Sequence, residues 1–100
     1  MKQIGTYKEA FGDNYLPLKE QISKESIVGK EKILAYLKKG EVIAVAGSIG
    51  FKDILADKQI FEDDLVYSDG QYEWFTETVY YFEHYNLKLP DEFIQAVLSK

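Results

Sequence analysis

The stretch Leu65-Val66-Tyr67-Ser68-Asp69-Gly70-Gln71-Tyr72-Glu73-Trp74 carries the clearest structural signal in this sequence. Two runs rich in β-branched and aromatic residues flank Asp69-Gly70, and this dipeptide tolerates the positive φ angles of a type I′ turn. The stretch therefore predicts a two-residue β-hairpin in which Leu65 lies opposite Trp74. In that register one face, which we expect to be core, is formed by Leu65, Tyr67, Tyr72 and Trp74.

Upstream of the hairpin, the pattern predicts a helix followed at once by a strand. Apolar residues recur at helical spacing between Gly29 and Gly40, and Gly40 supplies a left-handed residue that can end the helix. Residues 42–46 are short, apolar and rich in valine and isoleucine, which is typical of a buried strand. Between that strand and the hairpin, residues 51–60 are expected to form a helical turn with Ile54 and Leu55 pointing inward.

Downstream of the hairpin, two further helices are predicted. Thr76 is a plausible N-cap for an aromatic helix that reaches Asn86. Pro90 suits the first position of a last helix, which buries Phe93 and its apolar neighbours. Residues 1–22 contain glycine, asparagine and proline breakers and are expected to form an irregular or partly helical N-terminal arm.

These elements predict a single α+β domain over residues 1–100. We expect a mainly antiparallel sheet of about three to four strands, including the Asp-Gly hairpin, packed by two to four helices. The chain has 15% aromatic residues, which is enough for a real core in a domain of 100 residues.

Composition excludes several classes of protein. The chain has no cysteine, so it has no disulfide framework, zinc finger or thiol nucleophile. Its apolar runs are too short to span a bilayer, and no signal-like block follows Met1, so a cytoplasmic protein without a membrane partner is expected. All 12 basic residues are lysine and the net charge is −5, which argues against a nucleic-acid partner.

The negative charge is concentrated in the second half of the chain. Residues 1–50 hold 8 lysines and 6 acids, whereas residues 51–100 hold 4 lysines and 11 acids, a balance of −7. Such a surface either keeps the protein soluble or attracts a basic partner. Because tyrosine and tryptophan are common at the centre of interfaces, the hairpin region is the candidate docking surface. The candidate partner-binding residues are Glu62, Asp63, Asp69, Glu73, Trp74 and Glu77, with Trp74 an anchor only if it is exposed.

Signals for catalysis or metal binding are weaker. Ser48 lies between two glycines after a strand, as in a nucleophile elbow, and His84 is the only available base, but one short strand cannot build the wide parallel sheet that such an elbow needs. A lone histidine without cysteine makes a zinc site improbable. The acids at 62–64 and Asp69 lack the spacing of a calcium loop. No metal site, cofactor or catalytic residue is therefore predicted.

Four motifs occur along the chain in a specific order: Tyr36-Leu37-Lys38-x-Gly40, Asp69-Gly70-x-Tyr72-x-Trp74, Tyr80-Tyr81, and Leu89-Pro90-x-Glu92-Phe93. In this pattern, which spans most of the chain from about Gly12 onward, the chain resembles a family of small, uncharacterised bacterial cytosolic proteins. The chain departs from the family pattern at Phe75 and Phe82. Both are apolar, so the departure leaves the expected fold intact but puts a shared surface partner in doubt.

Small acidic proteins of this kind are often similar to immunity proteins, which neutralise toxins in competition between bacteria, an analogy at the level of size and charge. We therefore expect a non-enzymatic module that binds another protein, most concretely an immunity-type inhibitor that covers the basic site of a bacterial toxin. The alternatives are a small-molecule-binding regulatory domain, a small hydrolase that uses the Ser48 loop, and a self-associating structural protein. A closed pocket with polar groups near Ser48 or His84 would favour small-molecule binding.

Overall fold

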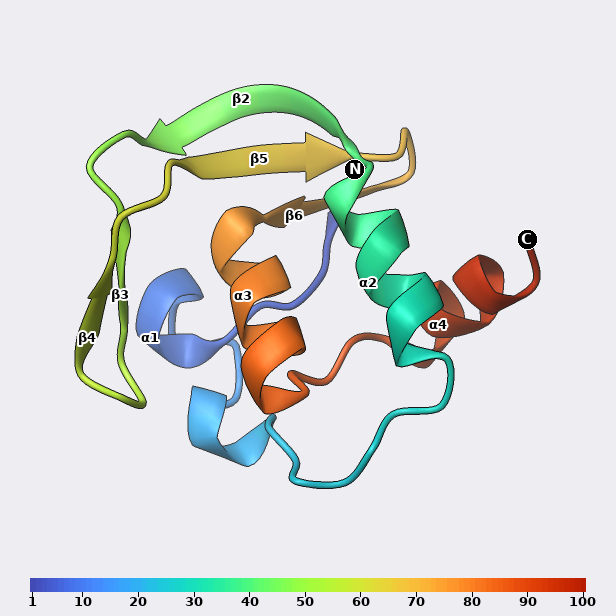
Figure 1. Ribbon diagram of the computed structural model, residues 1–100, viewed down its shortest axis with the longest axis horizontal. Helices are drawn as coiled ribbons and strands as arrows, with labels where there is room; N and C mark the ends of the chain where they lie inside the picture. The colour runs from blue at the N-terminus through green and yellow to red at the C-terminus, as the bar shows by residue number, and fades with distance from the viewer.

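The computed structural model describes all 100 residues and has the expected α+β architecture, with helices packed against a mainly antiparallel sheet (Figure 1). In chain order the elements are β1 (Lys2–Gln3), α1 (Lys8–Phe11), the 3-10 helix η1 (Leu18–Glu20), α2 (Lys30–Lys38), β2 (Glu41–Gly47), β3 (Phe51–Asp53), β4 (Lys58–Ile60), β5 (Asp64–Ser68), β6 (Tyr72–Phe75), α3 (Thr76–Tyr85) and α4 (Asp91–Leu98). None of the helices has the length and apolar character needed to cross a membrane.

The main sheet has four strands in the order β1-β6-β5-β2. β2, β5 and β6 pair antiparallel, and β1 adds a short parallel strand beside β6. β2 forms one edge of this sheet and arches over the top of the molecule in Figure 1. β3 and β4 form a separate two-stranded sheet.

The hairpin of β5 and β6 forms where it was predicted, but its register and turn type were predicted wrongly. Ser68 pairs with Glu73 and Tyr67 with Trp74, so the loop spans four residues, 69–72. The Asp69 carboxylate accepts the backbone N–H groups of Gln71 and Tyr72, at 2.9 and 2.7 Å, and this side-chain turn replaces the type I′ turn. The observed pairing differs from the predicted one by two residues, an even number, so every side chain lies on the face of the sheet where it was predicted.

β2 forms as a strand but is not buried, so the prediction of a buried strand over residues 42–46 is wrong in its burial. All residues from Glu41 to Ala46 are exposed, and Val45 keeps 63% of its surface. An apolar β-branched run predicts an extended backbone, but its burial depends on the position of the strand in the sheet. At an edge with no helix above it, the same residues face solvent.

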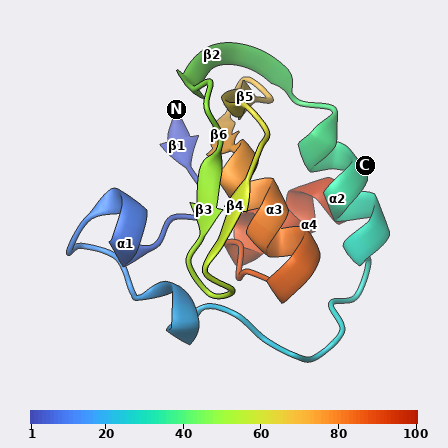
Figure 2. The same ribbon diagram turned by 60° about the vertical axis from the view of Figure 1, so that its left-hand side comes forward.

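Residues 51–60 form the β3–β4 hairpin, so the predicted helical turn is wrong. Phe51 pairs with Ile60 and Asp53 with Lys58, and the turn between them includes Asp57 in a left-handed conformation (φ 52°). Ile54, expected to point inward, is 41% exposed. Seen in Figure 2, this hairpin stands beside α3 as a separate wall of the molecule.

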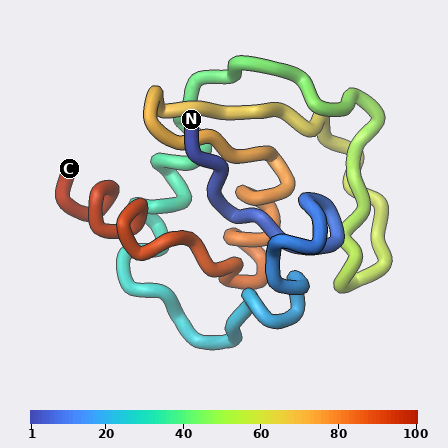
Figure 3. Tube along the Cα trace, turned by 180° about the vertical axis from the view of Figure 1, so that it is seen from behind, coloured from blue at the N-terminus to red at the C-terminus, as the bar shows by residue number.

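The N-terminal arm is partly helical, as expected, but it contributes more to the core than predicted. Ile4 and Tyr7 are almost fully buried, and Ile4 donates its N–H to the carbonyl of Glu73 at 3.0 Å. Leu18 is also fully buried, whereas Leu16 is 59% exposed. From behind, the arm runs across the body of the protein (Figure 3).

The three long helices lie close to their predicted positions, with small differences at the ends. α2 ends at Lys38, α3 starts at Thr76 with Phe75 as the extended residue before it, and α4 starts after Pro90. The prediction of a left-handed residue at Gly40 is wrong, because Lys39, the residue that follows α2, is right-handed and Gly40 has no positive φ. Asn86 ends α3 in a left-handed conformation. Together with the helix-facing side of the sheet, these helices enclose one core of 14 buried apolar residues, which includes Trp74.

Candidate functional site

The largest hollow in the molecule is a groove of about 860 Å³ between α3, β5 and the β3–β4 hairpin. It is large enough for a small ligand or for several side chains of a protein partner. We call its apolar lining residues Leu65, Tyr67 and Val79 the floor, and its charged lining residues together with Phe61 the rim. The lining residues are Lys38, Lys58, Ile60, Phe61, Glu62, Asp63, Leu65, Tyr67, Thr76, Val79, Tyr80, Glu83 and His84.

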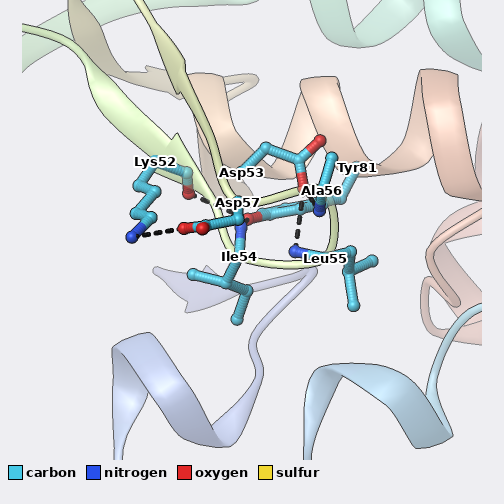
Figure 4. A network of polar contacts seen from close by, with 7 residues as sticks. All are labelled: Lys52, Asp53, Ile54, Leu55, Ala56, Asp57 and Tyr81. Carbon is cyan, nitrogen blue, oxygen red and sulfur yellow. Dashed lines mark hydrogen bonds and ion pairs between the residues drawn. The ribbon is translucent and has the colours of Figure 1, made fainter.

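One wall of the groove is held in place by the carboxylate of Asp53, the last residue of β3. This side chain is fully buried and accepts the hydroxyl hydrogens of Tyr80 and Tyr85 on α3, at 2.6 and 2.7 Å. Its other oxygen accepts the N–H groups of Leu55 and Ala56 in the β3–β4 turn, at 2.9 and 3.0 Å (Figure 4). Asp53 therefore organises its own turn and fastens the hairpin to α3.

A second contact between hairpin and helix comes from the hydroxyl of Tyr81. It donates to the carbonyl of Lys52 and accepts the N–H of Ile54, both at 3.1 Å. On the outer side of the turn Lys52 also pairs with Asp57 at 2.6 Å, where both side chains are largely exposed (Figure 4). The polar network is thus partly buried on the α3 side and open to solvent on the outer side.

The hydrogen bonds to Asp53 decide its charge state. Burial disfavours the carboxylate, but the two tyrosine hydroxyls and the two backbone amides outweigh that penalty, so the pKa of Asp53 lies below its usual value. In return, the hydrogen bond to the Asp53 carboxylate, together with burial, raises the pKa of Tyr85 to about 12. The wall is therefore held by a charged carboxylate at neutral pH.

Charges around the groove are partly paired. Lys38 of α2 and Glu83 of α3, which both line it, form an ion pair at 3.4 Å, with about half of each side chain exposed. Lys58 adds one cation, and Glu62 and Asp63 add two exposed acids where the chain passes from β4 to β5. Next to those acids, Phe61 keeps 86% of its surface exposed. An exposed apolar ring therefore lies next to two exposed carboxylates at the groove.

His84, near the end of α3, lines the groove. Its ring packs on that of Tyr80, with centroids 4.5 Å apart, and the residue is exposed. Ser48, the candidate nucleophile, lies in the exposed loop between β2 and β3 and does not line the groove. The structure therefore brings His84, but not Ser48, to the site.

Two of the six predicted partner-binding residues, Glu62 and Asp63, line the groove, and Asp69 does not. Asp69 lies at the opposite end of β5, where it caps the hairpin turn and accepts the hydroxyl of Tyr36 at 2.7 Å. Burial disfavours its charge, but the Tyr72 amide and the Tyr36 hydroxyl lower its pKa overall. Its carboxylate is committed to the turn.

Glu73 and Trp74 do not belong to the groove surface either. Glu73 is half-exposed on the face of the sheet opposite Trp74. Trp74 is fully buried and donates its indole N–H to the carbonyl of Leu37 at 3.0 Å. The condition under which Trp74 could anchor a partner is therefore not met, because the indole is a core side chain that joins β6 to α2.

Glu77 is half-buried at the start of α3, beside Asp64. Burial and the neighbouring Asp64 carboxylate raise the pKa of Glu77 to about 7, and one Asp64 oxygen is buried without a hydrogen-bond partner. Burial also raises the pKa of Asp64. Burial and the proximity of the two carboxyl groups therefore both act against the ionisation of Glu77.

No three histidine, aspartate or glutamate side chains converge where a metal ion could be held. The residues that the sequence analysis missed are Asp53 and the tyrosines that bind it. In the sequence, Tyr80 and Tyr85 are two of several aromatic residues on the helix that reaches Asn86, and Asp53 is one of 17 acids. No local signal in the sequence marks Asp53 as buried, because it directly follows another charged residue, Lys52; its burial is seen only in the structure of β3.

We compared the chain with protein-family models, curated proteins and solved structures, and none of them matches it. The resemblance described from the sequence therefore stays a prediction.

Proposed function

We propose that this chain is a non-enzymatic protein-binding module, and most concretely an immunity-type inhibitor that covers the basic site of a bacterial toxin. The observation that carries the proposal is the groove rim, where the exposed ring of Phe61 stands next to the carboxylates of Glu62 and Asp63. An apolar contact beside unpaired acids suits a partner surface with a hydrophobic patch and several cations.

The net charge of −5 supports the same proposal. A field of this sign accelerates the encounter with a basic partner and weakens as salt screens it. Neither Glu62 nor Asp63 makes an ion pair within the chain, so both charges are free to act on a partner.

Co-expression with the toxin encoded by the neighbouring gene tests the proposal. The wild-type chain is expected to protect the cells, and the double variant Glu62→Lys with Asp63→Lys is expected to lose that protection. The matched control is Asp13→Lys with Glu25→Lys, which changes the net charge equally at exposed positions outside the groove. Absence of protection by the wild type, or equal loss in both double variants, would contradict the proposal.

A second candidate function, small-molecule binding, is favoured by the contact of the groove with His84 and Lys58. The volume of the groove, about 860 Å³, lies within the usual range for ligand sites. Thermal-shift screening against a panel of small anionic metabolites tests this alternative. It requires a ligand that stabilises the wild type but stabilises neither Lys58→Ala nor His84→Ala.

A further inference from the structure

The edge strand β2 has an unusual surface for a natural protein. Its outer side has no neighbouring strand, so it presents unpaired backbone N–H and C=O groups. Natural edge strands are usually protected by lysine, proline or a covering segment. Here residues 42–46 are all apolar and all exposed, with 49% of the surface of Val42 and 45% of that of Ile43 in contact with solvent.

The apolar surface of β2 continues that of the groove. Val42 pairs with Tyr67 and Val45 with Leu65, so each valine lies on the same side of the sheet as a residue of the groove floor. A strand added beside β2 would direct every second side chain toward this side, where the floor and the edge form one surface.

The charges near β2 indicate the chemistry of the added strand. Glu41 begins the strand, and Gly47 at its end pairs with Asp64, which directly follows the exposed acids Glu62 and Asp63. Lys38 and Lys39 precede β2, but Lys38 is paired with Glu83. A second copy of this chain would bring another net charge of −5 to the edge, whereas a cationic segment is attracted to it.

We propose that β2 accepts an extended basic segment of the partner as a fifth strand of the main sheet. This inference rests on the proposed function, because it assigns the partner's mode of binding at the same surface. Main-chain hydrogen bonds to β2 supply affinity, and alternate apolar side chains pack toward the groove. The pairing of β2 with β5 is irregular between Val42 and Ala44 and between Val45 and Gly47, so the added strand is short.

The decisive variant is Val45→Glu, because it separates apolar strand pairing from simple charge attraction. It makes the protein more acidic, so attraction to a basic segment by charge alone would become stronger. Loss of an apolar edge contact is expected instead to weaken binding roughly tenfold. The matched control is Val28→Glu, which adds the same charge at an 86% exposed position outside the groove and the sheet.

The probe is a short synthetic peptide that alternates valine and lysine, with a valine–glutamate peptide as the negative control. Hydrogen exchange of the wild-type backbone amides, followed by NMR, is expected to show new protection in residues 41–47 only with the lysine peptide. This readout needs no variant, and thermal unfolding checks that both variants remain folded.

Two results would overturn strand addition: equal affinity of the Val45→Glu and Val28→Glu variants, or protection confined to residues outside β2. A concentration-dependent dimer that protects β2 without peptide would overturn the choice of partner. If the neighbouring toxin is neutralised through Glu62 and Asp63 while β2 stays unprotected, strand addition fails and the proposed function stands. If β2 binds the peptide but the chain protects no cell, strand addition stands and the toxin proposal fails.

Discussion

Replacing Asp53 by asparagine tests the strongest polar interaction in the fold. Asparagine preserves the size of the side chain, and its carbonyl oxygen can still accept the N–H groups of Leu55 and Ala56. Its NH₂ group then takes the place of the oxygen that accepts the hydroxyls of Tyr80 and Tyr85. Both hydroxyls lose a charged acceptor; Asp53 has no exposed surface, whereas Tyr80 and Tyr85 are partly exposed.

Hydrogen bonds to charged groups contribute about 1.5–3 kcal/mol each, and neutral ones about half as much. Two such bonds are lost and two are weakened, but the partly exposed tyrosine hydroxyls can bond to water instead. We therefore expect Asp53→Asn to lower the free energy of unfolding by about 3 kcal/mol, which is less than the sum of the four separate bonds. In a domain of 100 residues this corresponds to a Tm lower by roughly 10–20 °C. Urea denaturation and calorimetry at pH 7 measure both quantities.

Asp57→Asn is the matched control in the same hairpin. Asp57 has 84% of its side chain exposed, and its ion pair with Lys52 is open to solvent, so its loss changes stability little. Asp57 also has φ 52°, a conformation that asparagine adopts readily. The same chemical change is therefore expected to be severe at position 53 and nearly silent at position 57.

The pH dependence provides an independent check. Because the folded-state pKa of Asp53 lies below its ordinary value of 3.8, the carboxylate contributes stability above about pH 4 and loses it as the pH falls through the folded pKa. The stability difference between wild type and Asp53→Asn should therefore narrow in acid. A difference below about 0.5 kcal/mol at neutral pH, or one that does not narrow in acid, would refute the reasoning.

Three further substitutions test other parts of the structure. Glu77→Gln is expected to stabilise the protein by about 1–2 kcal/mol at pH 8 but not at pH 5, as measured by denaturation at both pH values. The reason is that Glu77 has a folded pKa of about 7 beside Asp64, so its ionisation lowers the free energy of unfolding as the pH rises from about 4.5 to 7. Trp74→Phe should cost about 2–3 kcal/mol by urea denaturation, since it leaves the Leu37 carbonyl without its indole donor and opens space in the core; an unchanged midpoint would contradict the buried position of the ring. Gly50→Ala should destabilise the β3–β4 hairpin and lower the Tm by several degrees, because the new Cβ would lie 2.1 Å from a backbone carbonyl of β4 at φ +95°; a scan matching the wild type would argue against this geometry.

Local signals in the sequence were sufficient for the type of most elements. The helical spacing before Gly40 predicted α2, the alternating runs around Asp69-Gly70 predicted β5 and β6, and Pro90 marked the start of α4. Each of these signals acts within a few residues, through turn geometry or the period of apolar side chains. The α+β class follows from their order along the chain.

The candidate site depended on contacts that no local signal contains. Asp53 lies 27 residues from Tyr80, and its role is visible only when β3 and α3 are packed together. Glu62 and Asp63 belong to the groove, while Asp69, only a few residues away, lies at the far end of β5. The run of acids therefore looked like one surface in the sequence although a strand separates its members in space.

The sequence by itself determined that the chain is a small acidic α+β domain with an Asp-Gly hairpin and an acidic second half. Only the tertiary structure decided that Trp74 is core, that the apolar residues 42–46 are exposed at the edge of the sheet, and that Glu77 lies half-buried beside Asp64. Propensity and charge are properties of single residues and their neighbours. Burial and strand order arise from contacts between distant segments, and those contacts set which residues a partner can reach.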